Sequence, residues 1–133
     1  MIKFDIAGEP KAKQRPRHGK GFTYTPKETV NYENYVKMCY LEKNKPMALE
    51  GMIQAEIDCF FTIPKSFSKK KQEEAKSYKL RPTKKPDVDN IAKSILDSLN
   101  GIAYKDDSQI VDCEIHKYYS VIPRVEVTLR DIK

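Results

Sequence analysis

The sequence predicts a single α+β domain in which helices pack on one face of a mixed β-sheet. Along the 133 residues, apolar residues recur at every second position in some segments and at every third or fourth position in others. The first period is typical of strands and the second of amphipathic helices. The segments run strand, strand, helix, strand, helix, helix, strand, strand, an order that suits helices layered on a sheet. The length is that of one domain, so we expect residues 1–133 to form one unit.

The N-terminal segment is expected to form a strand and then a hairpin. Ile2–Ala7 alternates weakly in hydrophobicity, and Phe22–Tyr24 is expected to return as a strand after the turn at Gly19 and Gly21. Between them, basic side chains occupy alternate positions, so in an extended chain they point the same way and suit successive phosphates of a DNA backbone. A solvated basic loop is the alternative interpretation. These basic residues are Lys11, Lys13, Arg15 and Arg17.

A helix is predicted to begin near Thr25 and to end near Lys43. Thr25 is a suitable N-cap, Pro26 suits the first helical position, and Glu28 completes a capping box. Tyrosines at helical spacing are explained more simply by core packing than by stacking on bases. The inner stripe of this helix is expected to consist of Tyr32, Tyr35, Val36 and Cys39.

The middle of the chain combines a strand with a strongly basic segment. Gly51–Ile63 alternates between apolar and polar residues, which predicts a strand with one buried face, and Pro64 ends it. Ser68–Ser77 is expected to form a short helix capped by Ser68. Residues 65–85 carry nine basic and two acidic side chains, whereas the net charge of the whole chain is +6. We expect this segment to hold phosphates, and a merely soluble lysine-rich loop is the alternative.

The next helix is predicted by a single apolar stripe and by strong signals at both of its ends. Pro86 suits a helix that begins just after it. The pair Asn100-Gly101 is a strong stop signal, because both residues tolerate the left-handed conformation. The stripe at helical spacing consists of Val88, Ile91, Ala92, Ile95 and Leu99.

Acidic residues lie at both ends of this predicted helix. Asp87 and Asp89 mark its start, Lys93 follows four residues later, and Asp106 and Asp107 come after its end. Carboxylate oxygens are ligands that Mg²⁺ prefers in proteins. We therefore expect folding to bring acidic oxygens from both ends of the helix to one divalent ion. The alternative is that these aspartates only cap the helix and shape the following turn.

Two further strands are predicted at the C-terminus, Gln109–Ser120 and Arg124–Arg130, with a Val-Ile-Pro turn between them. Val111, Cys113 and Ile115 are expected to share one apolar face of the first strand. All three cysteines of the chain follow apolar patterns, so we expect buried free thiols in a reducing cytosol. They are Cys39, Cys59 and Cys113.

The composition favours an anionic partner and argues against several classes of protein. A net charge of +6 and a pI near 9.1 favour nucleic acid as the partner. The sequence has no C-x-x-C metal pair, no signal peptide and no apolar run near the roughly 20 residues of a membrane span. We expect a cytoplasmic protein that has no membrane partner and associates with the nucleoid when it is bound to DNA. His116 lies on a polar strand face without a nearby serine or cysteine partner, which does not favour a nucleophilic triad.

The segment KPDVDNIAKSILDSLNGIAYKDDSQI resembles the signature of the RusA family of Holliday junction resolvases. The shared elements are D-x-D-N, a lysine four residues after the second aspartate, a D-x-L-N-G helix end and D-D-x-Q-[IV]. The opening GEPKAKQRPR is also similar to that family. The resemblance implies a homodimeric, Mg²⁺-dependent crossover junction endodeoxyribonuclease, with Mn²⁺ as a substitute. Such enzymes are often encoded by prophages and resolve four-way DNA junctions by paired symmetric cuts in recombination and repair.

The resemblance also assigns site residues. Asp87, Asp89 and Asp107 match the metal-binding catalytic acids, and Lys93 matches the catalytic lysine. Asp106 is a rival to Asp107 as the third ligand. Asn90, Asp97 and Asp106 are expected beside the ligands rather than among them. The residues expected to contact DNA are Lys11, Lys13, Arg15, Arg17, Lys69, Lys70, Lys71, Lys84 and Lys85.

Two other functions remain compatible with the same residues. The first is another metal-dependent nuclease, such as one that cuts flaps or RNA–DNA hybrids. The second is a branched-DNA-binding protein without catalytic activity, whose aspartates only cap a helix. Substrate comparison separates the first from a junction resolvase, and substitution of Asp87 separates the second.

Overall fold

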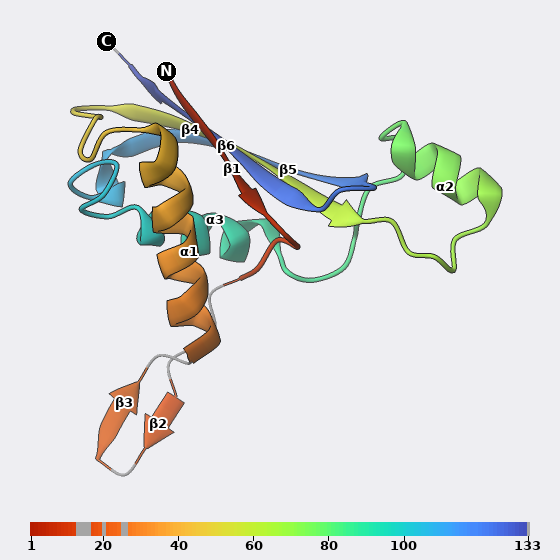
Figure 1. The fold of residues 1–133 in the computed structure, drawn as a ribbon, viewed down its shortest axis with the longest axis horizontal. Helices are drawn as coiled ribbons and strands as arrows, with labels where there is room; N and C mark the ends of the chain where they lie inside the picture. The colour runs from red at the N-terminus through yellow and green to blue at the C-terminus, as the bar shows by residue number, and fades with distance from the viewer. Residues whose placement is uncertain (13–16, 20, 25–26, 133) are drawn as a thin grey trace.

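The computed structural model describes residues 1–12, 17–19, 21–24 and 27–132. Its centre is a four-stranded sheet with the strand order β1-β6-β4-β5 (Figure 1). Strand β6 is antiparallel to both of its neighbours, whereas β4 and β5 run parallel, so the sheet is mixed as predicted. The strands are β1 (Ile2–Ala7), β4 (Ile53–Thr62), β5 (Ile110–Ser120) and β6 (Arg124–Asp131).

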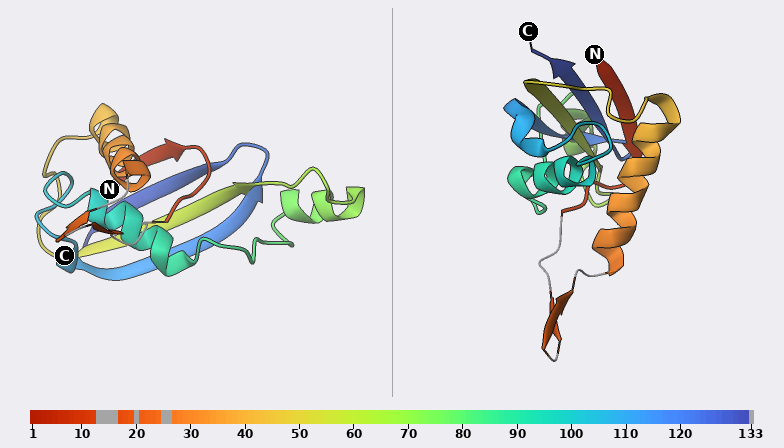
Figure 2. Two further views of the ribbon diagram at one scale, coloured as in Figure 1. Left: turned by 90° about the horizontal axis from the view of Figure 1, so that it is seen from below. Right: turned by 90° about the vertical axis from the view of Figure 1, so that its left-hand side faces the viewer.

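Two helices, α1 (Lys27–Lys43) and α3 (Val88–Ser98), cover one face of the sheet (Figure 2). The core lies between this face and the helices, and it includes fully buried Val36, Ile57 and Ile95. Burying one such side chain contributes about 1.5–3 kcal/mol. The alternation of β4 places every second side chain in this core, which is the pattern that the sequence predicts.

The opposite face of the sheet is covered by no helix of the described chain (Figure 2). Its side chains alternate with the core residues and are half-buried along β4 and β6. Polar residues on this face pair with one another. Arg124 Nε lies 2.7 Å from Glu126 Oε2, and His116 Nδ1 lies 3.0 Å from Asp58 Oδ1. We call this surface the bare face of the sheet.

Helix α2 (Lys69–Lys76) stands at the far end of the sheet rather than over it (Figure 1). Ala75 is its one buried residue. Ser68 caps the helix as predicted, because its side chain accepts a hydrogen bond of 3.2 Å from the backbone N–H of Lys71. The expectation that helices pack on one face of the sheet therefore holds for α1 and α3 and not for α2.

The predicted hairpin forms a second, two-stranded sheet. Strands β2 (Arg17–Gly19) and β3 (Phe22–Tyr24) pair antiparallel with each other. Gly21 in the turn adopts a positive φ of 75°, a conformation that glycine takes without strain. Two of the four alternating basic residues that were predicted to contact phosphates, Lys13 and Arg15, lie outside the described residues.

Four residues that the sequence places on apolar faces are exposed or only half-buried, two of them because of strand register and edge position. Cys113 is exposed because β5 is an edge strand, and Val111 is 54% exposed because the pairing with β4 skips it at a bulge. Cys39 is only half-buried, so Cys59 alone of the three thiols is buried as expected. In α1 the buried position falls on Tyr40, whereas Tyr35 is 39% exposed.

Candidate functional site

The start of α3 presents two carboxylates to solvent. Asp87 occupies the N-cap position with extended backbone (φ −72°, ψ 153°), and Asp89 lies in the first helical turn. The side chain of Asp87 makes no capping hydrogen bond. Both aspartates are exposed. The carboxylate of Asp87 is therefore not used to cap the helix, which weakens the alternative that its role is only structural.

The exposed side of α3 continues with Lys93 and Asp97 at four-residue intervals from Asp89. Residues four apart lie on the same side of a helix. The opposite side is fixed in the core by fully buried Ile91 and Ile95. This packing holds the Asp89, Lys93 and Asp97 side outward. The rise of an α-helix separates the backbones of Asp89 and Asp97 by about 12 Å.

After α3 the chain turns back along a tight loop in which Ala103 and Tyr104 are buried. Gly101, at a positive φ of 74°, donates its N–H to the carbonyl of Tyr104 at 2.8 Å. The hydroxyl of Tyr104, fully buried, donates to the carbonyl of Leu96 at 2.6 Å. The loop therefore returns to the last turn of α3 and places the following aspartates beside that turn.

The two adjacent aspartates have different environments. The Asp106 carboxylate accepts a hydrogen bond of 3.1 Å from the N–H of Ser108, and the Asp106 N–H donates to the side-chain carbonyl of Gln109 at 3.1 Å. This capping box begins the 3₁₀ turn η1 (Asp107–Gln109). Hydrogen bonds from Ser108 hold the pKa of Asp106 below its usual value. The Asp106 side chain is thus occupied in local structure.

Asp107 instead faces the end of α3. Its N–H donates to the side-chain carbonyl of Asn100 at 2.8 Å. Its carboxyl group is hydrogen-bonded to Asp97, and this bond, with partial burial and the charges of Asp97 and Asp106, raises the pKa of Asp107. Two neighbouring carboxylates repel each other when both are ionised. A divalent cation bound between Asp97 and Asp107 would relieve that repulsion.

The carboxylates therefore form two separate pairs in one chain. Asp87 and Asp89 lie at the start of α3, and Asp97 and Asp107 lie at its end. Among the residues that the structure describes, no three His, Cys, Asp or Glu side chains are arranged to hold one metal ion. The expectation that acids from both ends of the helix meet at one ion is not met within the single chain, because the helix itself separates them.

Asp97 is closer to the site than the sequence suggested. It was expected only beside the ligands, whereas the structure gives it direct contact with Asp107. Two signals in the sequence point to this contact. Asp89, Lys93 and Asp97 share one helical face. The stop at Asn100-Gly101 is the signal that the chain reverses there.

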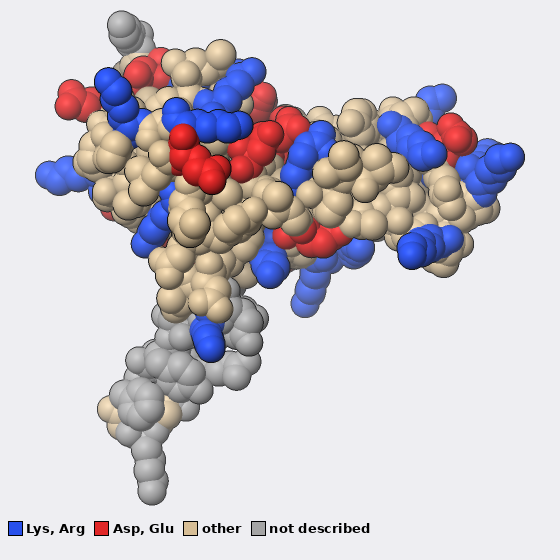
Figure 3. Space-filling view, viewed as in Figure 1, with Lys and Arg blue, Asp and Glu red and all other residues tan. Residues whose placement is uncertain are grey.

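The described lysines of the basic segment are exposed. Lys69, Lys70 and Lys71 form the first turn of α2, which holds no acidic residue, and Figure 3 shows basic side chains over the part of the molecule that carries this helix. Cations at the positive end of a helix dipole are unfavourable without a nearby anion. Lys84 and Lys85 are also exposed, close to the start of α3.

The alternating basic residues near the N-terminus are described only in part. Lys11 is exposed, and its Nζ lies 5.8 Å from the ring centroid of Tyr32. Strand β2 fixes the backbone of Arg17, and its side chain lies outside the described part. Contact between these basic residues and DNA phosphates therefore stays a prediction.

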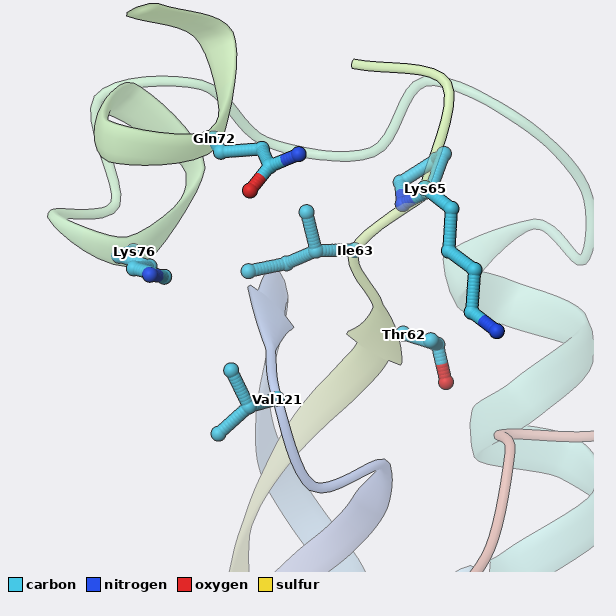
Figure 4. A pocket seen from close by; sticks show the side chains of 7 residues that line it. Thr62, Ile63, Lys65, Gln72, Lys76 and Val121 are labelled. Carbon is cyan, nitrogen blue, oxygen red and sulfur yellow. The ribbon is translucent and has the colours of Figure 1, made fainter. Parts of the chain in front are cut away.

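A pocket of about 250 Å³ lies between the end of β4, α2 and the β5–β6 turn (Figure 4). Lys65 and Lys76 lie on opposite sides of it, and Val121 also lines it. None of the carboxylates of α3 lines this pocket. The carboxylates instead lie on an open helical surface, which suits a large polyanion better than a small enclosed ligand.

Comparisons with known proteins identify the family to which this chain is similar. A family model described as Endodeoxyribonuclease RusA matches residues 7–130. The chain is also 41% identical over 137 residues to a Bacillus subtilis (strain 168) protein named "Uncharacterized protein YqaN", covering 98% of this chain and 96% of that protein. No helix in the described residues has the length and apolar character needed to cross a membrane.

Proposed function

The chain belongs to the RusA endodeoxyribonuclease family, and on that premise we propose that it is a Mg²⁺-dependent endonuclease that resolves four-way DNA junctions. The family makes the protein a nuclease. The preference for junctions, the dependence on Mg²⁺ and the pairing of two symmetric cuts are the proposal. The observation that carries it is the exposed start of α3, where the Asp87 side chain caps no helix and Asp89 and Lys93 follow on the exposed side.

The donor set on α3 fits a hard divalent cation. Mg²⁺ takes oxygen ligands, commonly one or two carboxylates with waters and phosphate oxygens completing its shell. Asp87 and Asp89 would hold such a cation at the start of the helix, and Asp97 with Asp107 would hold one at its end. When bound, the cation supplies positive charge at the phosphate and a water of lowered pKa.

Lys93 has a separate role in the proposal. It lies on the exposed side of α3 between the two carboxylate pairs. A fixed cation near the phosphoryl oxygens stabilises the negative charge that develops on them in the transition state. Lys93→Gln is therefore expected to lower the rate of cleavage by about 10²–10³-fold, which is the range for loss of one such group.

The basic surface supplies DNA affinity without sequence reading. Lys69, Lys70 and Lys71 project from α2, and Lys84 and Lys85 precede the carboxylates. Lysine contacts to phosphates hold the backbone and carry no base specificity. A protein that recognises DNA in this way would select a substrate by the shape of its branches.

Cleavage assays on defined substrates test the proposal. Equal amounts of a four-way junction, a flap and an RNA–DNA hybrid are incubated with the protein, with and without Mg²⁺. The expected result is Mg²⁺-dependent cutting of the junction at two symmetric positions, with little cutting of the flap or hybrid. Equal cutting of all three substrates contradicts junction specificity, and unchanged cutting in EDTA contradicts the metal requirement.

A further inference from the structure

Aromatic rings and arginines form a layered cluster on the bare face of the sheet, at the end nearest α2. Phe60 of β4 and Tyr118 of β5 are neighbours in register, and their rings stack with centroids 5.4 Å apart at 26°. The Arg81 guanidinium lies 4.5 Å from the centroid of Tyr118, and that of Arg124 lies 3.9 Å from the centroid of Phe60. We call Phe60, Tyr78, Arg81, Tyr118 and Arg124 the aromatic–arginine patch.

Tyr78 occupies a backbone position that normally favours glycine. It follows Ser77, the C-cap of α2, and has a positive φ of 66°. Helices commonly end with glycine at this position, because a bulky side chain is strained there. The Tyr78 ring lies 4.8 Å from the ring of Tyr118 and 6.3 Å from that of Phe60, yet the residue remains 46% exposed. A strained, half-exposed tyrosine in such a cluster indicates a use for its ring beyond the turn.

The carboxylates of the bare face that adjoin the patch have partners. Glu126 forms an ion pair with Arg124, and Asp58 lies within hydrogen-bond distance of the His116 ring. His116 in turn stacks beside Tyr118, with centroids 6.0 Å apart. The patch therefore offers flat cationic and aromatic surface without an unpaired negative charge among the described residues in direct contact with it.

The two arginines differ in their free donors. Arg124 is held by Glu126 and also donates to the Ser120 hydroxyl at 3.2 Å and to the Ile122 carbonyl at 2.9 Å. Arg81 donates from Nε to the carbonyl of Lys117 at 2.8 Å. Within the described part of the chain, the terminal nitrogens of Arg81 donate to no protein acceptor. Arg81 is thus positioned by one hydrogen bond and retains donors for an anion.

One loop connects the patch to the carboxylates of α3. Tyr78 and Arg81 contact Tyr118 on the bare face, whereas the Nζ of Lys84 lies 5.8 Å from the ring of Phe61, whose side chain is in the core on the opposite face. The loop therefore passes around the edge strand β5. Asp87 follows Lys84 by three residues, so a DNA strand near Asp87 has a basic path to the patch.

We propose that the aromatic–arginine patch binds one unpaired nucleotide of the DNA substrate. The base stacks on the exposed ring of Tyr78 and on the guanidinium of Arg81, and the terminal nitrogens of Arg81 hold the adjacent phosphate. Aromatic rings on open sheet faces and arginine planes are known platforms for unstacked bases. The proposal rests on the proposed function for its substrate, because the branch point of a junction supplies bases that are readily unstacked.

A second copy of the chain is a poorer occupant of this patch. In a two-fold interface the same surface meets itself. A two-fold axis through the patch would bring Arg81 of each protomer toward the other. Like charges facing each other across an interface are unfavourable. The phosphate of a nucleotide instead supplies a negative charge that can pair with Arg81.

Binding assays in EDTA test the patch independently of cleavage. A fluorescent eight-residue oligothymidylate reports affinity by anisotropy, and 2-aminopurine at the branch point of a junction reports stacking by quenching of its fluorescence. Tyr78→Gly removes the ring and relieves the positive φ, Tyr78→Phe keeps the ring, and Arg81→Gln removes the charge. Met47→Gly is the matched control, since Met47 also has a positive φ (53°) and is 45% exposed.

The expected result is a reduction in affinity of about 5- to 100-fold for Tyr78→Gly, the range for one base–aromatic stack. Quenching of 2-aminopurine disappears with it. Tyr78→Phe and Met47→Gly are expected to bind like the wild type, and Arg81→Gln to bind more weakly. Circular dichroism checks the fold of each variant. If Tyr78→Gly loses helix, the Arg81→Gln and Tyr78→Phe pair decides the question.

Two results would overturn the patch. In the first, Tyr78→Gly and Arg81→Gln both bind oligothymidylate and quench 2-aminopurine within twofold of the wild type. In the second, these variants sediment as monomers where the wild type sediments as a dimer, while their DNA binding is unchanged. The second result would make the patch a protomer interface. The two proposals can also fail separately. If the wild type cuts no junction while Tyr78→Gly still loses oligothymidylate binding, the junction proposal is contradicted and the nucleotide-binding role of the patch is supported.

Discussion

At the scale of single residues, the structure distinguishes aspartates that the sequence could not. Asp106 is occupied in a capping box, whereas Asp107 is hydrogen-bonded to Asp97 and has a raised pKa. Asp87 is at an N-cap position without acting as a cap. The carboxylates of Asp87 and Asp107 therefore make no capping hydrogen bond. A carboxylate that binds a metal ion must be available in this way.

The raised pKa of Asp107 predicts a pH dependence of stability. The folded state holds the proton of Asp107 more tightly than the unfolded chain does. This contribution to stability is therefore present below the unfolded pKa and is lost as pH rises through the folded pKa. In metal-free protein, Asp97→Asn removes the repulsion and is expected to raise the melting temperature at pH 7 and not at pH 3. Thermal denaturation at both pH values measures this.

The control for this experiment is Asp131→Asn, which removes an exposed aspartate at the end of β6. Mg²⁺ is expected to raise the melting temperature of the wild type more than that of Asp97→Asn. An Asp97→Asn variant no more stable at pH 7 than Asp131→Asn would show that the two carboxylates do not repel each other.

Substitutions at the acidic pair separate capping from metal binding. Asp106→Asn keeps a capping oxygen and is expected to cut junctions normally, whereas Asp106→Ala loses the cap and lowers the melting temperature. Asp107→Asn is expected to keep the fold and to abolish cleavage. Melting curves and cleavage rates of the three variants measure both effects. Normal cleavage by Asp107→Asn, with no cleavage by Asp106→Asn, would reverse the assignment of the third ligand.

At the scale of elements, local patterns predicted what depends on neighbours in sequence. The stripe of Ile91 and Ile95 and the stop at Asn100-Gly101 predicted α3, and the structure has it at Val88–Ser98. Pairing between distant strands was not predictable in this way. The bulge at Val111 and the edge position of Cys113 follow from the pairing of β4 with β5. Local periodicity carries no information about which strand lies at an edge.

The same limit applies to the candidate site. The residues of α3 and their common exposed face follow from helical spacing. The position of Asp107 beside Asp97 depends instead on the path of residues 100–106, which is fixed by hydrogen bonds of Tyr104 to Leu96 and Gly101. A resemblance to a family assigns residues to roles and gives no distances between them.

The first turn of α2 is expected to bind DNA phosphates. Replacing Lys69, Lys70 and Lys71 together by Gln should weaken junction binding and reduce the slope of log affinity against log salt by about 0.9 for each phosphate that is no longer neutralised. The same change should stabilise the free protein slightly, because it removes cations from the positive end of the helix dipole. Titrations at several salt concentrations measure the slope.

The control removes two exposed lysines near the end of α1, Lys43 and Lys45, in the same way. This pair of substitutions is expected to change the salt slope less. An equal change of slope in both sets of variants would mean that the effect comes from net charge and not from α2.

At the scale of the whole molecule, the fold assigns different tasks to its surfaces. One face of the sheet is closed by α1 and α3, which fixes the carboxylates on the outer side of α3. The other face is bare and carries the aromatic–arginine patch. Helix α2 stands at the end of the sheet with a single buried residue, so its lysines are available to a large partner.

Two symmetric cuts require two active sites, and one chain of 15.4 kDa carries one set of these residues. We therefore expect a two-fold dimer. Sedimentation equilibrium should give about twice the mass of the chain, with or without junction DNA. A monomer that stays monomeric on junction DNA would contradict paired cutting by a single assembly.

The measurement that tests the central claim most directly compares wild type and Asp87→Asn on a four-way junction, for cleavage in Mg²⁺ and for binding in EDTA. The account predicts that Asp87→Asn no longer cleaves the junction while it binds it at least as tightly, because a negative charge has been removed from the phosphate surface. Asp131→Asn, the matched control, should cut and bind like the wild type. Normal cleavage by Asp87→Asn would contradict the claim that the start of α3 performs the reaction.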